Sequence, residues 1–291
     1  MIDKPALDAY VARYRRDGFL HVPGVLTAEE IARHGAAVDE AVATRKKGDT
    51  RRLEEKTPYE QSFVQCQYIW EDFPGVRPLT FHPVIGQLAA ALTGGERVRL
   101  WHDQALYKEA GGRETEPHTD QPYWPINETD TVTAWIPFEK TDDTSGCMGY
   151  VPGSHANKAE FIDIFSAKGD GETLIEKFAD TPPVFVHCKP GDVIFHNGST
   201  VHLAKPNRSD RTRRVYTAIY FRDGCTRGGD RPHPSVDRDN IAKGASIGGG
   251  ATPIVWPLPE GCIPEPAPWP EAGAAWRERA ERLGIIPRRA G

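Results

Sequence analysis

Two side chains that bind metal ions stand close together near the middle of the sequence, in His118-Thr119-Asp120. An imidazole and a carboxylate two residues apart lie on the same side of an extended backbone, because side chains alternate along a strand. We therefore expect His118 and Asp120 to be ligands of one metal ion. Such a pair is common by itself, and a solvated turn or a surface ion pair is the alternative explanation.

A third ligand is expected from a distant strand, and His202 is the best candidate. Two histidines and one carboxylate form the facial triad of non-haem Fe(II) oxygenases, which leaves three coordination positions open. His196 shares strand parity with His202 and is a rival from the residues alone. His102 and Asp103 are adjacent, so on a strand they face opposite ways and form a poor chelating pair.

The elements that must position these side chains change type along the chain. Helices are expected at residues 5–16, 27–44 and 82–93; Thr27 and Glu30 form a capping box for the second, and Gly94-Gly95 ends the third. Residues 49–68 show no clear pattern. Short alternating segments then predict strands at residues 98–108, 131–139, 148–151, 183–187, 192–196 and 213–222.

Several short strands at this spacing favour an antiparallel sandwich or jelly roll. Residues 157–180 interrupt the strands with a partly helical insertion. Beyond residue 223 the chain is rich in glycine and proline, and a final helix is expected at about residues 271–283. We interpret this last part as a tail that wraps the strands rather than as a second domain.

Composition limits the kinds of partner and compartment. A formal net charge of −5 and a pI near 6.1 argue against nucleic-acid binding, which requires a basic face. The five cysteines are widely spaced without a Cys-x-x-Cys pair, which is typical of reduced thiols. Because we find neither a long apolar segment nor a signal-peptide pattern, we expect no membrane association and a cytoplasmic protein.

The order of the short motifs is more specific than any one of them. After His118-Thr119-Asp120 come Gly146-Cys147-Met148, Pro152-Gly153-Ser154-His155, Pro190-Gly191-Asp192, Phe195-His196, His202, Asn207 and Arg213. From about Asp17 to Arg222 this succession resembles the phytanoyl-CoA dioxygenase family of Fe(II)- and 2-oxoglutarate-dependent oxygenases. The resemblance implies Fe(II) as cofactor, with 2-oxoglutarate and O2 as co-substrates. It also implies that His196 packs beside the metal without binding it and that His155 is a structural loop residue.

The same resemblance suggests which residues hold 2-oxoglutarate. Arg213 follows His202 at the family's spacing, and a guanidinium can hold the distal carboxylate with two hydrogen bonds. The neighbouring Arg214 would face away from it by strand parity, and a solvated arginine is the alternative interpretation. Gln104 and Trp135 match further positions of the co-substrate pocket. Ala204 departs from the family, which usually has a serine or threonine there.

The resemblance also completes the expected fold. We predict a mainly β, α+β structure: a double-stranded β-helix (a jelly roll of the cupin-like kind) with flanking helices. Residues 1–291 are expected to form a single domain. Residues 1–96 would be its mostly helical N-terminal part, 97–223 its jelly-roll core, and 224–291 its C-terminal extension.

The predicted function is hydroxylation of an unactivated C–H bond of a small organic molecule, with release of succinate and CO2. Asp120 occupies the place where halogenating relatives of the resembled family carry a small residue, so we expect a hydroxylase or a desaturase and not a halogenase. Gln121, Tyr123 and Trp124 follow the metal ligands and are candidates for the substrate pocket, as are Tyr68 and Trp70, although core packing is an alternative for all of them.

The sequence leaves the identity of the substrate and the oligomeric state open. No basic cluster for a CoA ester is evident, so phytanoyl-CoA itself is not predicted. The alternative functions are a catalytically inactive jelly-roll protein that binds a metal or small molecule, and a zinc hydrolase that uses the same triad.

Overall fold

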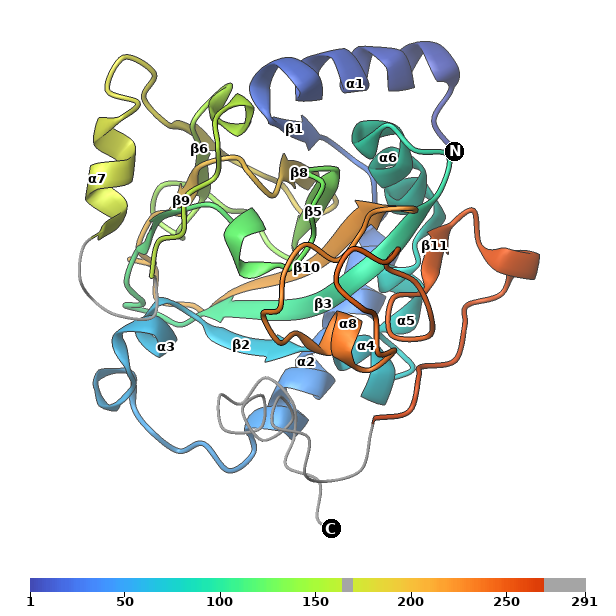
Figure 1. Ribbon diagram of the computed structural model, residues 1–291. Coiled ribbons are helices and arrows are strands. Elements are labelled where there is room, and N and C mark those ends of the chain that lie inside the picture. The colour runs from blue at the N-terminus through green and yellow to red at the C-terminus, as the bar shows by residue number, and fades with distance from the viewer. Residues whose placement is uncertain (164–169, 270–291) are drawn as a thin grey trace.

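Two antiparallel β-sheets and a set of flanking helices make up the fold (Figure 1). The computed structural model describes residues 1–163 and 170–269. The helices are α1 Lys4–Asp17, α2 Ala28–Lys46, α3 Pro58–Ser62, α4 Ile69–Asp72, α5 Arg77–Thr80, α6 Pro83–Thr93, α7 Asp170–Glu176 and α8 Pro234–Asp237. The strands are β1 Phe19–Val22, β2 Val64–Gln67, β3 Val98–Lys108, β4 Thr115–His118, β5 Thr131–Pro137, β6 Met148–Tyr150, β7 Val184–Val186, β8 Val193–Asn197, β9 His202–Ala204, β10 Arg213–Arg222 and β11 Ile254–Trp256.

The larger sheet has seven strands in the order β1-β8-β5-β10-β3-β11, and β2 also pairs with β3. The predicted strands at 98–108 and 213–222 are confirmed as β3 and β10, which pair along their whole length. Both faces of these strands are largely buried: one face packs against the helices and the other faces the second sheet. This inner face carries Gln104, Trp135, His196 and Arg213.

The smaller sheet has four strands in the order β4-β9-β6-β7. Between the two sheets lies an apolar layer to which both contribute: Trp135, Ile194 and Val215 from the larger sheet, and Tyr150 and Ala204 from the smaller one. The smaller sheet therefore faces the inner side of the larger sheet, and its strands β4 and β9 approach the middle of that face.

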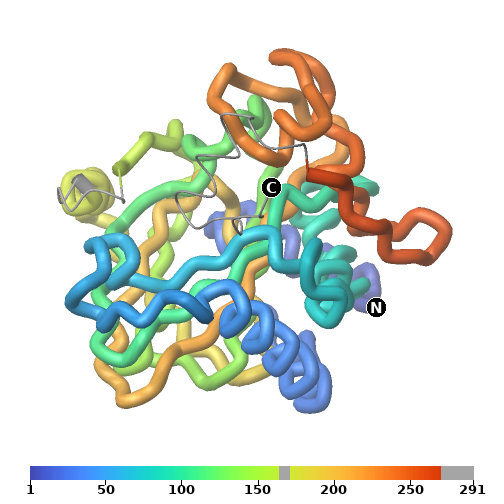
Figure 2. The backbone as a smooth tube through the Cα atoms, turned by 90° about the horizontal axis from the view of Figure 1, so that it is seen from below, coloured from blue at the N-terminus to red at the C-terminus, as the bar shows by residue number. Residues whose placement is uncertain are grey.

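The main hydrophobic core lies on the opposite, outer face of the larger sheet. Tyr14 of α1, Val38 of α2 and Leu88 of α6 pack there against outward-facing strand residues such as Ala134 and Tyr216. Viewed from below, the blue and teal helices α2 and α6 lie on the opposite side of the molecule from the yellow helix α7 (Figure 2). Among the described residues, no helix is both long and apolar enough to cross a bilayer.

Local sequence signals account for the N-terminal elements. The predicted helices at 5–16, 27–44 and 82–93 are confirmed as α1, α2 and α6, and the Thr27–Glu30 capping box is present. Gly18 ends α1 with a positive φ of 79°. A Cβ there would lie 2.4 Å from Nδ1 of His155, so this close approach requires glycine.

The larger sheet draws strands from outside residues 97–223. β1 and β2 come from the N-terminal part, and β11 comes from the C-terminal extension. The extension also packs Val236 and Ile247 against Trp101 and Phe221 of the inner face. These contacts support the interpretation of the chain as one domain, which stays a prediction. The helix expected at 271–283 lies outside the described residues.

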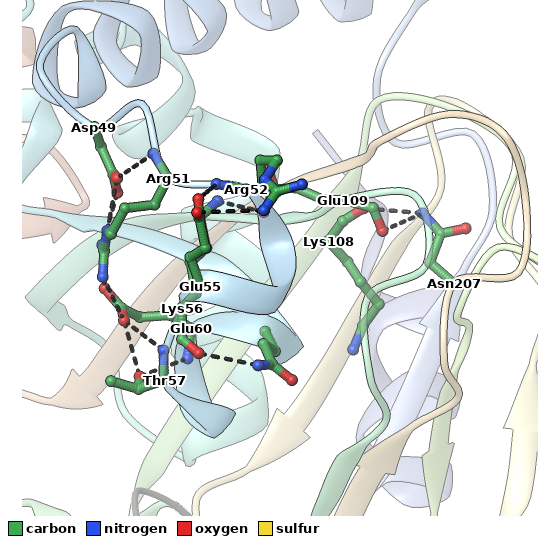
Figure 3. Close-up of polar contacts among 11 residues, drawn as sticks. Asp49, Arg51, Arg52, Glu55, Lys56, Thr57, Glu60, Lys108, Glu109 and Asn207 are labelled. Carbon is green, nitrogen blue, oxygen red and sulfur yellow. Dashed lines mark hydrogen bonds and ion pairs between the residues drawn. The ribbon is translucent and has the colours of Figure 1, made fainter.

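Asn207 connects the end of β3 to the turn before β10 through hydrogen bonds. Its amide Nδ2 donates to the backbone carbonyls of Lys108 (2.9 Å), Glu109 (3.1 Å) and Arg211 (2.7 Å), and the residue is fully buried. Figure 3 shows Asn207 beside the backbone of Lys108 and Glu109. The side chain thereby sets where β10 begins, and β10 begins with Arg213.

Replacing Asn207 with alanine is expected to lower the free energy of unfolding by about 3 kcal/mol, because three backbone carbonyls lose their donor in a buried turn. Urea denaturation followed by circular dichroism measures the change. The exposed Asn127, which donates to Thr226 Oγ1, provides a control whose replacement should cost less than about 1 kcal/mol. Equal losses in the two variants would contradict the structural role of Asn207.

Candidate metal centre

His118 and His202 face each other across the pair formed by β4 and β9. They are direct cross-strand partners, and their ring centroids are 4.2 Å apart. Asp120 lies just beyond the end of β4, and its Oδ1 is 3.7 Å from Nε2 of His118 and 3.8 Å from Nε2 of His202. One ligand atom from each residue falls within 4.8 Å of the other two, so the three residues form one compact donor set.

The expected extended backbone through Asp120 is wrong. Strand β4 ends at His118, and Asp120 has helical dihedral angles of φ −80° and ψ −36°. The turn arises because the backbone N–H groups of Asp120 and Gln121 both donate to the carbonyl of Gly198, at 2.8 Å each. The carboxylate still reaches both imidazoles, because the turn brings it back over the strand end.

Both histidines present Nε2 to the centre of the site. Nδ1 of His118 lies 2.7 Å from the carbonyl of Glu116, and Nδ1 of His202 lies 3.0 Å from the carbonyl of Thr200. A carbonyl only accepts hydrogen bonds, so Nδ1 carries the proton and Nε2 keeps its lone pair for a metal. Burial lowers the pKa of both imidazoles to about 4, and they are therefore neutral ligands at pH 7.

Asp120 is held in its charged form. Burial by itself would raise the pKa of this carboxyl, but His202, His196 and His118 together lower it well below its usual value. His196 Nε2 lies 3.4 Å from Oδ2 of Asp120, on the side away from Oδ1. One carboxylate and two neutral imidazoles fit a divalent ion such as Fe(II), and they form a facial set rather than a closed one.

Replacing His196 with leucine is expected to lower Fe(II) affinity about 10- to 100-fold, because Asp120 loses the partner that orients its second oxygen. Anaerobic equilibrium dialysis measures the change, and replacement of the half-exposed His187 is the control. An unchanged Fe(II) affinity would show that Asp120 is oriented without His196.

Within residues 1–163 and 170–269, two other groups of possible metal ligands occur: His21 with Cys188 and Asp192, and Asp143 with Cys147 and His187. In the first, Asp192 accepts hydrogen bonds from the backbone of Gly24 and Lys189 and from His21. In the second, Asp143 is already paired with Lys205 and His187. Their carboxylates are thus occupied by the protein, whereas Oδ1 of Asp120 faces Nε2 of His118 and of His202 at 3.7 and 3.8 Å.

Arg213 lies buried on the inner face, and only 3% of it is exposed. Its Nη1 donates to the carbonyl of Gly146 at 2.6 Å, its guanidinium carbon lies 5.5 Å from the ring centre of Trp135, and its Nε has no hydrogen-bond partner among the described residues. Burial lowers its pKa to about 10, so it stays cationic. A buried cation with an unused N–H group is suited to bind an anion such as a carboxylate.

The sheet register places Trp135 between the metal centre and Arg213. Thr133 pairs with His196, and Trp135, two residues along β5, pairs with Thr217 of β10. Arg213 stands four residues before Thr217 on β10 and faces the same side. A ligand that extends from the metal to Arg213 would therefore pass over Trp135.

Gln104 faces the same side as Trp135, in the next strand but one. Its Oε1 accepts hydrogen bonds from Nε2 of Gln65 at 2.6 Å and Nε2 of Gln67 at 3.2 Å. The two donors lie on β2, in the stretch that the sequence left unassigned. The alternation in Val64-Gln65-Cys66-Gln67 is a signal that would have put both glutamines on one face.

The residues after Asp120 take different places. The amide of Gln121 is used by the fold: it donates to the carbonyls of Ile126 (3.3 Å) and Glu128 (3.1 Å) and accepts from Thr131 (2.7 Å). Trp124 packs in the apolar cluster with Trp101. Tyr123 donates to the carbonyl of Ile162 in the insertion. Their substrate roles stay predictions, and these contacts favour Tyr123 most.

Tyr68 and Trp70 lie deeper than expected. Trp70 belongs to the main core on the outer face, against Phe81. The hydroxyl of Tyr68 is 3.1 Å from that of Ser235 in α8, and its ring contacts His102. Trp70 therefore lies on the outer face of the larger sheet and not on the inner face that carries the site residues.

The C-terminal extension reaches the loop that follows the metal ligands, a contact the sequence did not indicate. Arg231 Nη1 donates to the carbonyl of Pro122 at 2.8 Å, and its guanidinium lies 5.1 Å from the ring centre of Phe161 and 5.8 Å from that of Tyr123. Three separate segments thus meet at Pro122, two residues after Asp120.

A protein-family model described as phytanoyl-CoA dioxygenase matches residues 14–215. The dioxygenase lolE1 of Epichloe uncinata is 29% identical over 152 residues, which are 51% of this chain and 53% of that protein. The phytanoyl-CoA dioxygenase of Arabidopsis thaliana is 26% identical over 184 residues, which are 61% of this chain and 63% of that one. The chain spans about half the length of the curated relatives it matches first.

Solved structures match a larger share of the chain than these two curated relatives do. The non-haem α-ketoglutarate-dependent carbocyclase SnoK from nogalamycin biosynthesis has a TM-score of 0.70 and 29% identity, with 84% of this chain and 95% of that one covered. The epimerase SnoN, in complex with Fe3+, α-ketoglutarate and nogalamycin RO, has a TM-score of 0.67 and 28% identity, with coverage of 87% and 100%.

Proposed function

Because the chain belongs to the phytanoyl-CoA dioxygenase family, we propose that it is an Fe(II)- and 2-oxoglutarate-dependent oxygenase that hydroxylates an unactivated C–H bond of a small organic molecule. One observation carries the proposal: His118, Asp120 and His202 form a compact donor set, and the inner face also carries a buried arginine, Arg213, that has no anionic partner among the described residues. An inactive binding protein would have no need to keep both.

Different residues would bind the metal and the co-substrate. His118, Asp120 and His202 would hold Fe(II), which activates O2 together with 2-oxoglutarate and yields succinate and CO2. Arg213 would bind the distal carboxylate of 2-oxoglutarate, and Trp135 would form the floor between the two ends. His196 keeps Asp120 oriented. The apolar layer between the sheets excludes water from this space.

The proposed substrate is an uncharged, oxygen-bearing molecule rather than a CoA ester. Gln65 and Gln67 both donate to Oε1 of Gln104, so the amide N–H groups of Gln104 have no acceptor among the described residues. These N–H groups could donate to a carbonyl or hydroxyl oxygen of a ligand on the inner face. Tyr123 and the ring of Phe161 would line the apolar part of a substrate entrance. Gln104 thus either contacts the substrate or borders the co-substrate.

We further propose that the two sheets form the double-stranded β-helix of the cupin-like fold and that the chain is a single domain. The mutually facing sheets and the long β3–β10 pair support the first statement. The cytoplasmic location that the cysteine pattern indicates stays a prediction.

The function is tested by succinate formation from 2-oxoglutarate without added substrate, since such enzymes turn over slowly in an uncoupled reaction. Succinate is expected only when Fe(II) and O2 are both present, and zinc should not replace iron. Succinate that forms without O2, or hydrolytic activity with zinc, would contradict the proposal and favour other metal chemistry on the same triad.

A further inference from the structure

Lys108 lies beside Arg213 in the interior of the protein. The two residues are direct cross-strand partners at the ends of β3 and β10. Lys108 has no exposed surface, and only 3% of Arg213 is exposed. Figure 3 shows the Lys108 side chain extending away from Glu109 and Asn207. Two basic side chains at one buried place repel each other unless an anion joins them.

The described residues supply no such anion. Within the part of the chain that the structure describes, no carboxylate oxygen lies within 4.0 Å of Lys108 Nζ or of the Arg213 guanidinium. Glu109, next to Lys108, is paired with Lys56. Glu139, whose charge raises the pKa of Arg213, is paired with Arg214. Lys108 Nζ instead donates to the carbonyl of Arg113 and lies 3.4 Å from Oγ1 of Thr115.

Both side chains converge on Gly146. Arg213 Nη1 donates to the Gly146 carbonyl, and a Cβ at Gly146 would lie 3.1 Å from Cδ of Lys108. Thr115 stands opposite Ala204 across the β4–β9 pair, so its hydroxyl faces the same layer. A guanidinium, an amine and a hydroxyl therefore surround one place at the far end of the path over Trp135.

We propose that Lys108 is a second cationic ligand of the distal carboxylate of 2-oxoglutarate, beside Arg213, and that its amine takes up one proton from solvent when the co-substrate binds. This inference rests on the proposed function and adds a residue to it. Thr115 would orient the amine. The step is an acid–base one: the neutral amine gains a proton and becomes an ammonium ion paired with the carboxylate.

The charges around Lys108 explain why the proton arrives with the ligand. Burial, followed by the charge of Arg213, lowers the pKa of the amine to about 6; Glu114 raises the pKa and Arg113 lowers it by smaller amounts. Cys147 and Tyr150, which also face Arg213, have raised pKa values and are neutral at pH 7. At pH 7 the amine is thus mostly uncharged, and a carboxylate placed next to it raises the pKa and draws in a proton.

The alternative is a purely structural lysine that holds the turn before β4 by donating to Arg113. Such a lysine would affect stability when replaced but would take up no proton on ligand binding. The number of protons taken up is therefore the quantity that separates the two roles.

Isothermal titration calorimetry of the anaerobic Fe(II)-loaded protein at pH 7, repeated in two buffers of different ionisation enthalpy, measures this number. The probes are 2-oxoglutarate and 2-oxopentanoate, which has the same carbon chain without the distal carboxylate. For the unmodified protein we expect about one proton taken up per 2-oxoglutarate and about none per 2-oxopentanoate. This comparison needs no variant to fold.

In Lys108→Met the proton uptake with 2-oxoglutarate should disappear and the dissociation constant should rise about 10- to 100-fold. Lys56→Met, which removes an amine already paired with Glu109, should leave both values unchanged. Equal proton uptake for the two probes, or uptake that persists in Lys108→Met, would overturn the inference. A wild-type protein that binds Fe(II) but no 2-oxoglutarate would instead contradict the proposed function itself.

Discussion

Replacing His202 with alanine is expected to lower Fe(II) affinity by more than about 100-fold and to abolish O2-dependent succinate formation. The loss of a hydrogen-bond partner outside the ligand set costs about 10- to 100-fold in metal affinity, and the loss of a ligand costs more. His118 and Asp120 alone would leave four open positions and a loosely held ion. Anaerobic equilibrium dialysis gives the affinity, and succinate quantification gives the turnover.

His187→Ala is the matched control for His202→Ala. This half-exposed histidine is paired with Asp143 and belongs to a different group of residues from the triad. Its Fe(II) affinity should equal that of the unmodified protein. Retention of tight Fe(II) binding by His202→Ala would show that another residue, with His196 the first to consider, is the third ligand.

Replacing Arg213 with methionine is expected to raise the dissociation constant for 2-oxoglutarate about 100-fold or more while leaving Fe(II) affinity unchanged. A buried carboxylate that loses its charged partner typically loses about 3–5 kcal/mol. Arg213→Lys should retain part of the affinity, since an ammonium keeps the positive charge but cannot form the bidentate hydrogen bonds of a guanidinium. Titration of 2-oxoglutarate into the Fe(II) protein without O2 measures each constant.

The next residue provides the control. Arg214 faces the outer side of the sheet, where it pairs with Glu139 and Asp39. Arg214→Met removes the same charge one residue away, and its 2-oxoglutarate affinity should stay within about twofold of the original. If the two methionine variants bind equally well, the distal carboxylate is not bound at Arg213.

Strand parity explains why part of this site was predictable from the sequence. Side-chain alternation in β10 separates Arg213 from Arg214, and the structure places the first inside and the second at the surface. The bounds of β3 and β10 were predictable because each is a segment rich in apolar and aromatic residues that is bounded by turns containing glycine, proline or aspartate. The sequence also assigned His118 and Asp120 to one site, and the structure brings them together through a turn instead of the expected extended backbone.

Other parts of the site depend on tertiary contacts that the local sequence does not encode. The turn at Asp120 exists because two N–H groups meet the carbonyl of Gly198, a residue distant in sequence. Lys108 reads as a solvated strand-end lysine and is buried only because the turn around Asn207 closes over it. The contact between Arg231 and Pro122 joins the C-terminal extension to the metal loop in the same way.

The anaerobic visible spectrum of the protein tests the central claim most directly. Fe(II) is added first and 2-oxoglutarate second, and the metal-to-ligand charge-transfer band of the chelate is followed in the unmodified protein and in Arg213→Met. We expect a band that saturates with 2-oxoglutarate and that requires about 100-fold more of it in the variant. Iron that binds tightly without giving the band on addition of 2-oxoglutarate would contradict the account, because the triad would then serve a different co-substrate.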